Sequence, residues 1–283
     1  MASSENNAVP PAAAAQPLKL FGSWASSYTH RVQLALRLKG LEFEYAEEDL
    51  GSKSEELLRC NPVYKKVPVL VHAGRALPES VVILQYLDDA WPETRPLLPA
   101  DAFDRATARF WCHFADDKLG PAVGAVFAST GEGQEAAVRQ VHENLALIEA
   151  ELRDGAFKGR RFFGGDEVGL LDVVLGCGSY WLAVFEEVTG VRLVDADAFP
   201  LFHAWLRAFE ALDEVRDTIP AVDRLLDYAR GVRHMLLSAG AAAASAPAAA
   251  DAPTAARRLT SPSTYDKMAG PAAGQGRPAG DLQ

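Results

Sequence analysis

Residues 18–40 read LKLFGSWASSYTHRVQLALRLKG, and this stretch decides the fold of the first part of the chain. Residues 18–22 predict a strand, and residues 28–39 predict a helix that Gly40 ends. Ser26 is therefore expected at a strand-to-helix turn, beside unpaired backbone N–H groups and the positive end of a helix dipole. Such a place favours an anion, including a thiolate. The alternative is that Ser26 or Ser27 serves only as the N-cap of the helix.

The composition is that of an acidic globular protein. The 283 residues carry a formal net charge of −10, so neither nucleic acid nor an anionic membrane surface is an expected partner. The three cysteines, Cys60, Cys112 and Cys177, lie far apart in the sequence and form no zinc-binding pattern. We therefore predict no metal site and a reducing compartment, the cytosol. We also expect neither a secretory signal nor a membrane span.

The chain divides by composition into five segments. Residues 1–17 and 239–283 are rich in Ala and poor in large apolar side chains, so both are predicted to be disordered. Residues 92–99 are rich in Pro and predict a linker. We expect one folded domain at residues 18–91 and a second one at residues 100–238.

The two domains differ in their hydrophobic pattern. In the first, strands are expected at 42–47, 67–72 and 75–77 and helices at 54–59 and 80–89, which predicts a four-stranded mixed sheet with helices on its faces. The second is predicted to be all helical. Its helices are expected near 103–119, 134–152, 199–209 and 221–235, with an apolar helix at 170–187 as the core.

Two lysines of the first domain are candidates for a site that includes Ser26. Lys53 follows the second predicted strand, and Lys66 precedes the third. Both are cations that suit a ligand with carboxylates. The plainer interpretation is that they are two solvated surface lysines, as most lysines are.

Two short segments of the first domain offer backbone groups to the same site. A cis bond between Val67 and Pro68 would leave the backbone of Val67 free to pair with an extended peptide, whereas the plainer interpretation is an edge-strand proline. Glu79 and Ser80 open a predicted helix. Ser80 is then an ordinary N-cap, a carboxylate-binding residue, or both.

Five motifs of the chain stand in the order and spacing of one known family. They are Trp24-Ala-Ser26-x-Tyr28-x-x-Arg31-Val32, Leu38-Lys39-Gly40, Glu47-Glu-Asp-Leu50 with Lys53-Ser54, Asn61-Pro-Val-x-Lys-Lys-Val-Pro68-Val-Leu, and Glu79-Ser80. Over residues 18–235 the chain resembles the tau class of plant glutathione transferases. The resemblance implies an α+β architecture, with an N-terminal thioredoxin-like βαβαββα domain followed by an all-α bundle. It also implies that Asp172, three residues after the N-cap Gly169, is a structural capping-box residue.

The resemblance implies a role for each matching residue. Ser26 would donate a hydrogen bond to the sulfur of glutathione, and Val67 would pair with its cysteinyl backbone. Lys53, helped by Lys66, would hold the glycyl carboxylate, and Glu79 and Ser80 would hold the γ-glutamyl end. An apolar electrophile would bind between the domains, against four residues: Tyr28, Phe114, Lys118 and Trp181. For the aromatic residues, a place in the core is the stronger alternative.

The resemblance further implies an enzyme of detoxification or stress metabolism. Glutathione would be a co-substrate, no cofactor would be tightly bound, and the protein would be a homodimer. Hydroperoxide reduction is a plausible second activity, and a non-catalytic carrier of apolar ligands is the alternative function. Thiol transfer is less expected, because it needs a cysteine where Ser26 stands and Cys60 is better explained by packing. Ser27 occupies a position where the family usually has proline, so the donor is Ser26 or Ser27.

Overall fold

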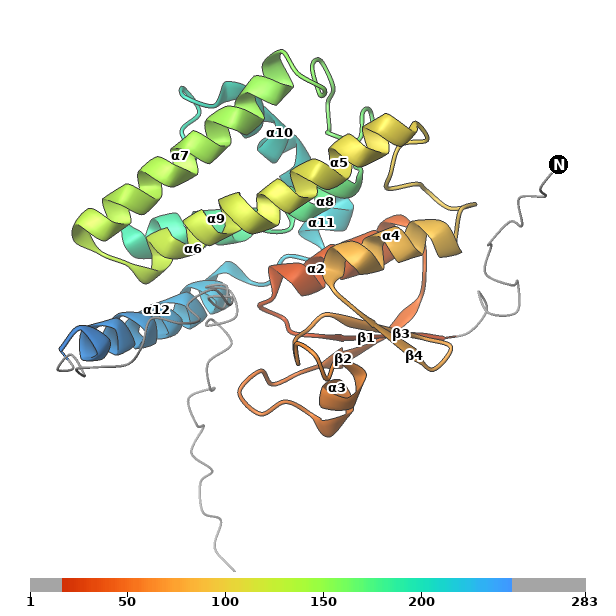
Figure 1. Ribbon diagram of the computed structural model, residues 1–283, viewed down its shortest axis with the longest axis horizontal. Helices are drawn as coiled ribbons and strands as arrows, with labels where there is room; N and C mark the ends of the chain where they lie inside the picture. Colours follow the sequence, from red (N-terminus) through yellow and green to blue (C-terminus); the bar gives the residue numbers. More distant parts are fainter. Residues whose placement is uncertain (1–16, 246–283) are drawn as a thin grey trace, which may run out of the picture.

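The computed structural model describes residues 17–245, which fold into a small sheet domain and a larger helical domain (Figure 1). The sheet has the order β2-β1-β3-β4, in which β1 is parallel to β2 and antiparallel to β3, and β4 is antiparallel to β3. Its elements are β1 (Leu18–Gly22), α2 (Ser27–Leu38), β2 (Phe43–Glu47), α3 (Glu55–Cys60), β3 (Val69–His72), β4 (Arg75–Pro78) and α4 (Ser80–Ala90). The predicted thioredoxin-like topology is confirmed.

Alternation along β1 explains how the sheet is covered on both faces. Leu18 and Leu20 belong to the large core that α2 and α4 share with the helical domain. Phe21 points to the other face and packs with Leu57 of α3 and Val69 of β3. In Figure 1, α2 and α4 accordingly lie on the side of the sheet that faces the helical domain, and α3 lies on the opposite side.

The helical domain contains a π-helical turn between two α-helices. Its elements are α5 (Ala102–Phe114), η1 (Ala115–Leu119), α6 (Gly120–Ala128), α7 (Gly131–Arg153), α8 (Leu170–Gly176), α9 (Ser179–Thr189), α10 (Pro200–Glu210), α11 (Asp213–Arg216) and α12 (Val222–Ser245). Helix α12 extends past Ser238, where the folded part was predicted to end. Alanine is the strongest helix former, which accounts for the extension into the run that begins at Ala241.

The prediction of one core helix over residues 170–187 is wrong. The chain forms two helices, α8 and α9, which are separated at Cys177 and Gly178. A Cβ atom on Gly176 would lie 2.3 Å from the ring of Phe209, so close packing requires glycine here. Glycine weakens a helix interior, and the apolar pattern gives no sign of such a packing demand from α10.

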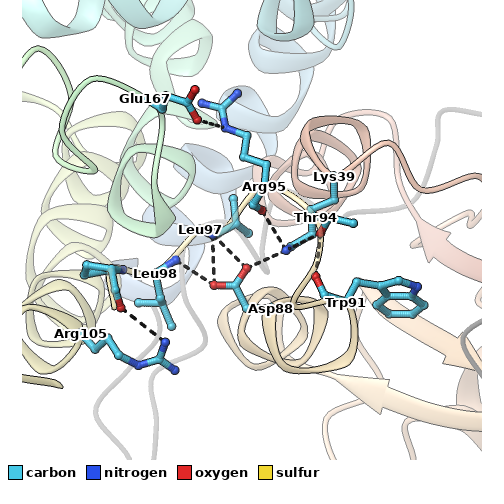
Figure 2. Close-up of polar contacts among 10 residues, drawn as sticks. Lys39, Asp88, Trp91, Thr94, Arg95, Leu97, Leu98, Arg105 and Glu167 are labelled. Carbon is cyan, nitrogen blue, oxygen red and sulfur yellow. Dashed lines mark hydrogen bonds and ion pairs between the residues drawn. The ribbon is translucent and has the colours of Figure 1, made fainter. Parts of the chain in front are cut away.

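The linker at residues 92–99 is held by a buried ion pair (Figure 2). The Lys39 Nζ lies 2.8 Å from the Asp88 Oδ1, and it also donates to the Thr94 hydroxyl and to the carbonyl of Arg95. Asp88 in turn accepts hydrogen bonds from the backbone N–H groups of Leu97 and Leu98. The linker is thus fixed to α2 and α4 by hydrogen bonds to its own backbone.

The two predicted disordered segments fall mostly outside the described part of the chain, which leaves out residues 1–16 and 246–283. Within residues 17–245, no helix combines the length and the apolar character that crossing a membrane requires.

Candidate active site

The turn after β1 makes Ser26 the N-cap of α2. The backbone of Ser26 is extended, with φ −88° and ψ 112°, and its Oγ accepts a hydrogen bond from the Thr29 N–H at 3.2 Å. The cap uses the oxygen of Ser26 as an acceptor, and the hydroxyl proton is bonded to no residue of the described chain. The cap and the donor interpretations are therefore compatible.

Ser27 has a different environment from Ser26. It is the first residue of α2 and only 5% exposed, whereas Ser26 is half-buried. Ser27 lines a cavity of about 60 Å³ that extends into the helical domain and includes Arg31 and Asp116 in its wall. Of the two hydroxyls, that of Ser26 is the more accessible from outside.

A cleft of about 410 Å³ lies between the sheet domain and the segment formed by α5 and η1. Its volume is within the usual range for small-molecule sites. The structure brings five of the predicted site residues together in its wall: Tyr28, Lys66, Val67, Glu79 and Ser80. These residues come from α2, from the segment before β3 and from the start of α4.

The backbone at two of these positions is unusual. The peptide bond between Val67 and Pro68 is cis, as the sequence suggested. Glu79, which precedes α4, has φ 75° and ψ 111°, a conformation that residues with side chains rarely adopt. A backbone conformation like that of Glu79 persists only where the surrounding structure maintains it. Such residues concentrate at ligand-binding sites.

Arg31 connects the cleft to the helical domain, a role that the sequence did not reveal. Its guanidinium makes a two-pronged contact with Asp116 at 3.0 and 2.7 Å and donates to the Ser80 Oγ at 3.3 Å. It also lies over the ring of Tyr28, 4.6 Å from its centre. Burial opposes the charge, but the Asp116 carboxylate raises the pKa of Arg31 above its ordinary value, so Arg31 stays charged.

The wall of this cleft does not include Ser26, Lys53, Phe114 or Lys118. Lys53 lies near it, because its Nζ donates to the carbonyl of Lys65 at 2.8 Å. Phe114 is half-buried, with its ring edge-on to Trp111 at 5.0 Å between centres, and Lys118 is exposed on η1. The described cleft therefore gives no support to Phe114 and Lys118 as its wall.

The expectation for Trp181 is corrected by the structure. Its side chain is 0% exposed, so it offers no surface to a ligand. Its indole N–H donates to the carbonyl of Ala25 at 3.1 Å. The alternative stated for aromatic residues at helical spacing, a place in the core, is the one observed.

Part of the cleft wall comes from residues that sequence reasoning missed. They are Asn61, Arg109, His113, Asp116 and Asp117, among others. The two aspartates belong to η1, and single π-helical turns inside α-helices are frequent at functional sites. No local signal in the sequence marks such a turn.

The cysteines do not supply a second reactive group. Cys112 and Cys177 are free and buried, and burial raises the pKa of each thiol to about 12, so both stay protonated and unreactive. Cys60 ends α3 and packs beside Phe21 and Leu57. Among the described residues, no group of His, Cys, Asp and Glu side chains could hold a metal ion.

Asp172 has the structural role that the sequence suggested. One of its carboxylate oxygens accepts from the N–H groups of Gly164 and Gly169, and the other accepts from the Phe163 N–H and the indole of Trp205. These contacts join the start of α8 to the loop before it and to α10. Asp172 lies in the core and is not part of the cleft.

Comparison with known proteins identifies the family. Residues 16–89 match the N-terminal domain model of the glutathione S-transferases, and residues 131–208 match a C-terminal domain model. A glutathione transferase of Zea mays, GST 23, is 48% identical over 78% of this chain and 98% of its own length. The tau-class enzyme of mango, Mangifera indica, superposes with a TM-score of 0.72 at 40% identity, over 76% of this chain and 97% of its own. Rice GST1, solved in complex with glutathione, superposes with 0.71 at 41% identity, over 78% and 97%.

The chain belongs to the glutathione S-transferases. Within them it is a tau-class member, which confirms the resemblance carried by the motifs. It is accordingly an enzyme that conjugates glutathione, and the alternative of a non-catalytic carrier on the same fold is not favoured.

Proposed function

We propose that Ser26 donates the hydrogen bond that stabilises the glutathione thiolate in this transferase. We also propose that the cleft holds the glutathione peptide beside Ser26. One observation carries the proposal: Ser26 caps α2 through its oxygen and keeps its hydroxyl proton available. Lys66, Val67, Glu79 and Ser80 in the cleft wall support it, because they offer a cation, backbone groups and a helix N-terminus to a peptide with two carboxylates.

The chemistry of the proposed step is the stabilisation of a thiolate. A free thiol has a pKa of about 8.5, and only the thiolate is the nucleophile. A charge-assisted hydrogen bond contributes about 1.5–3 kcal/mol, which lowers a pKa by about 1–2 units. Ser26 therefore acts by donating to the sulfur and does not become a nucleophile itself. The thiolate then attacks an apolar electrophile, which we place at the end of the cleft near Tyr28.

The experiment compares the thiolate absorbance of bound glutathione against pH in wild type, Ser26→Ala and Ser27→Ala. We expect Ser26→Ala to raise the pKa of the bound thiol by about 1–2 units and to slow conjugation of an aromatic electrophile at neutral pH by about 10- to 100-fold. Ser27→Ala serves as the matched control, because it removes a neighbouring hydroxyl that faces the inner cavity. A loss confined to Ser27→Ala would move the donor by one residue, and a wild type without bound thiolate would refute the mechanism.

We also propose that two copies of this chain form a homodimer. The support is a set of exposed apolar side chains on α4, on α5 and in the segment before β3: Val63, Tyr64, Val82, Phe103 and Phe110. Contiguous exposed apolar patches mark association surfaces, and we propose that these side chains belong to one. Light scattering should give the mass of a dimer for wild type and that of a monomer for Phe110→Glu, and a monomeric wild type would refute the proposal.

We propose the cytosol as the compartment of this enzyme. The three unpaired cysteines support it, since free thiols persist where glutathione keeps proteins reduced. Fractionation of cells that produce the tagged full-length chain tests it, and recovery in an organelle or membrane fraction would contradict it.

A further inference from the structure

The turn that precedes Ser26 is anchored partly within its own domain. The N–H of Ser26 donates to the carbonyl of Ser23 at 2.9 Å, and the N–H of Trp24 donates to the Glu47 carboxylate at 3.0 Å. The N–H of Ser23 donates to the Thr29 hydroxyl at 3.2 Å. These bonds hold the backbone N–H groups of the turn. The carbonyl of Ala25, which immediately precedes Ser26, has a partner from the helical domain.

The carbonyl of Ala25 is held by a side chain that lies 156 residues away in the sequence. The indole of Trp181 on α9 donates to it at 3.1 Å, and Trp181 has no exposed surface. The bond is partly buried, and loss of the indole N–H would remove a directional contact on this carbonyl and leave the turn free to shift. The residue next to the proposed thiolate donor is thus fixed from the helical domain.

The neighbouring residue of α9, Tyr180, contacts the helix that Ser26 caps. The hydroxyl of Tyr180 is hydrogen-bonded to the Nδ1 of His30 on α2, and both side chains are buried. Burial lowers the pKa of His30 to about 4, against the opposing effect of a hydrogen bond with the backbone of Trp24. His30 is therefore neutral at physiological pH. The backbone N–H of His30 donates to the carbonyl of Ser26 at 3.0 Å, so Tyr180 contacts the first turn of the helix that Ser26 caps.

We infer that Trp181 and Tyr180 are positioning residues for Ser26, since Trp181 holds the carbonyl before it and Tyr180 contacts His30 in the first turn of α2, so that both help to aim its hydroxyl. This inference rests on the proposed role of Ser26. It assigns to α9 a part in catalysis that requires no contact with either substrate. A displacement of about 1 Å at such a turn is enough to weaken a directional hydrogen bond to the sulfur severalfold.

The test removes the indole donor and keeps the shape of the side chain. Trp181→Phe and an isosteric replacement of Trp181 by 3-benzothienylalanine are titrated for the thiolate absorbance of bound glutathione, alongside the pH profile of kcat/KM. We expect the pKa of the bound thiol to rise by about 0.5–1 unit and kcat/KM to fall by about 3- to 10-fold at neutral pH, with recovery at high pH. Tyr180→Phe should shift the same pKa in the same direction.

Trp205 offers a matched control. It is also a buried tryptophan, and its indole makes one bond of 2.7 Å, to Asp172, in a part of the core that does not touch the turn. Trp205→Phe should lower the melting temperature and leave the thiol pKa unchanged. If the Trp181 variants behave in the same way as Trp205→Phe, Trp181 is only structural and the inference alone is overturned. If wild type binds no thiolate, the donor role of Ser26 fails and the inference fails with it.

Discussion

Two ion pairs join segments of this molecule that lie far apart in sequence, and they differ in burial and in what surrounds them. Lys39 and Asp88 have side chains only 1% and 8% exposed, and their other partners belong to the linker. Arg31 and Asp116 are 8% and 29% exposed, and their neighbours include residues of the cleft wall. The same chemistry therefore stabilises the fold in one place and shapes a binding site in the other.

The two pairs differ in what surrounds the carboxylate. We call a pair closed when its carboxylate is enclosed by the fold and open when its carboxylate is part of the cleft wall. Asp88 accepts from Lys39 and from two linker N–H groups, so its carboxylate is fully occupied within the fold. Asp116 is part of the cleft wall, and Arg31 reaches from it to Ser80. A closed pair contributes only to stability, because nothing outside the fold senses its charge. An open pair also contributes to the affinity for a ligand, because its geometry is transmitted to the site.

Breaking the closed pair gives the largest expected effect. Asp88→Ala leaves the Lys39 charge buried and two backbone N–H groups unpaired, so we expect a loss of about 3–5 kcal/mol in the free energy of unfolding. Thermal unfolding should show a melting temperature lower by about 10 °C, and the KM for glutathione of the folded enzyme should be unchanged. Glu167→Ala is the control: it removes a carboxylate that is 72% exposed and paired with Arg95 near the same linker, and it should have little effect. A raised KM in Asp88→Ala would contradict the distinction.

The contact between His30 of the sheet domain and Tyr180 of the helical domain gives the next effect. His30 has a folded-state pKa of about 4, lowered by burial, against about 6.5 when unfolded. Between these pH values the unfolded chain binds more protons than the folded chain. The contribution of neutral His30 to stability is therefore complete above pH 6.5 and is lost as the pH falls toward 4. Wild type should lose about 2 kcal/mol more than His30→Gln on going from pH 7 to pH 5. Chemical denaturation at both pH values measures this, and equal losses would show that His30 does not titrate in this window.

The open pair and the sheet domain also show how far the sequence could predict the structure. The sheet domain was predicted element by element, since the alternation in β1 and the glycine after α2 are local signals. Lys66, Val67, Glu79 and Ser80 were placed by motif spacing. The partner of Arg31 is 85 residues away, and nothing near Asp116 announces the π-helical turn that carries it. Contacts of this length depend on packing between domains, which a linear pattern does not encode.

The break between α8 and α9 shows the same limit within the helical domain. An unbroken apolar pattern predicted one helix, but the chain forms two, and Gly176 at the end of the first packs closely against Phe209. The error affected the site, because Trp181 was expected to face a ligand and instead holds the turn before Ser26. Side-chain direction depends on where a helix begins, so a misplaced boundary misassigns the residues near it.

Weakening the open pair gives the smallest expected change in stability and the most informative one in function. Asp116→Asn keeps one acceptor for Arg31 but removes the charge, and Asp116 is partly exposed, so we expect a loss of about 1 kcal/mol in the free energy of unfolding. The guanidinium would no longer be held toward Ser80, and the KM for glutathione should rise by about 3- to 5-fold. Asp117→Asn removes the same charge from the neighbouring position in the cleft wall without touching Arg31. Loss of a negative charge alone favours an anionic ligand, so this control should leave the KM unchanged or lower it. Steady-state kinetics of both variants therefore separates geometry from charge. A raised KM in Asp116→Asn only would mean that the open pair acts by orienting Arg31. An unchanged KM in Asp116→Asn would mean that this pair, like that of Lys39 and Asp88, contributes only to stability.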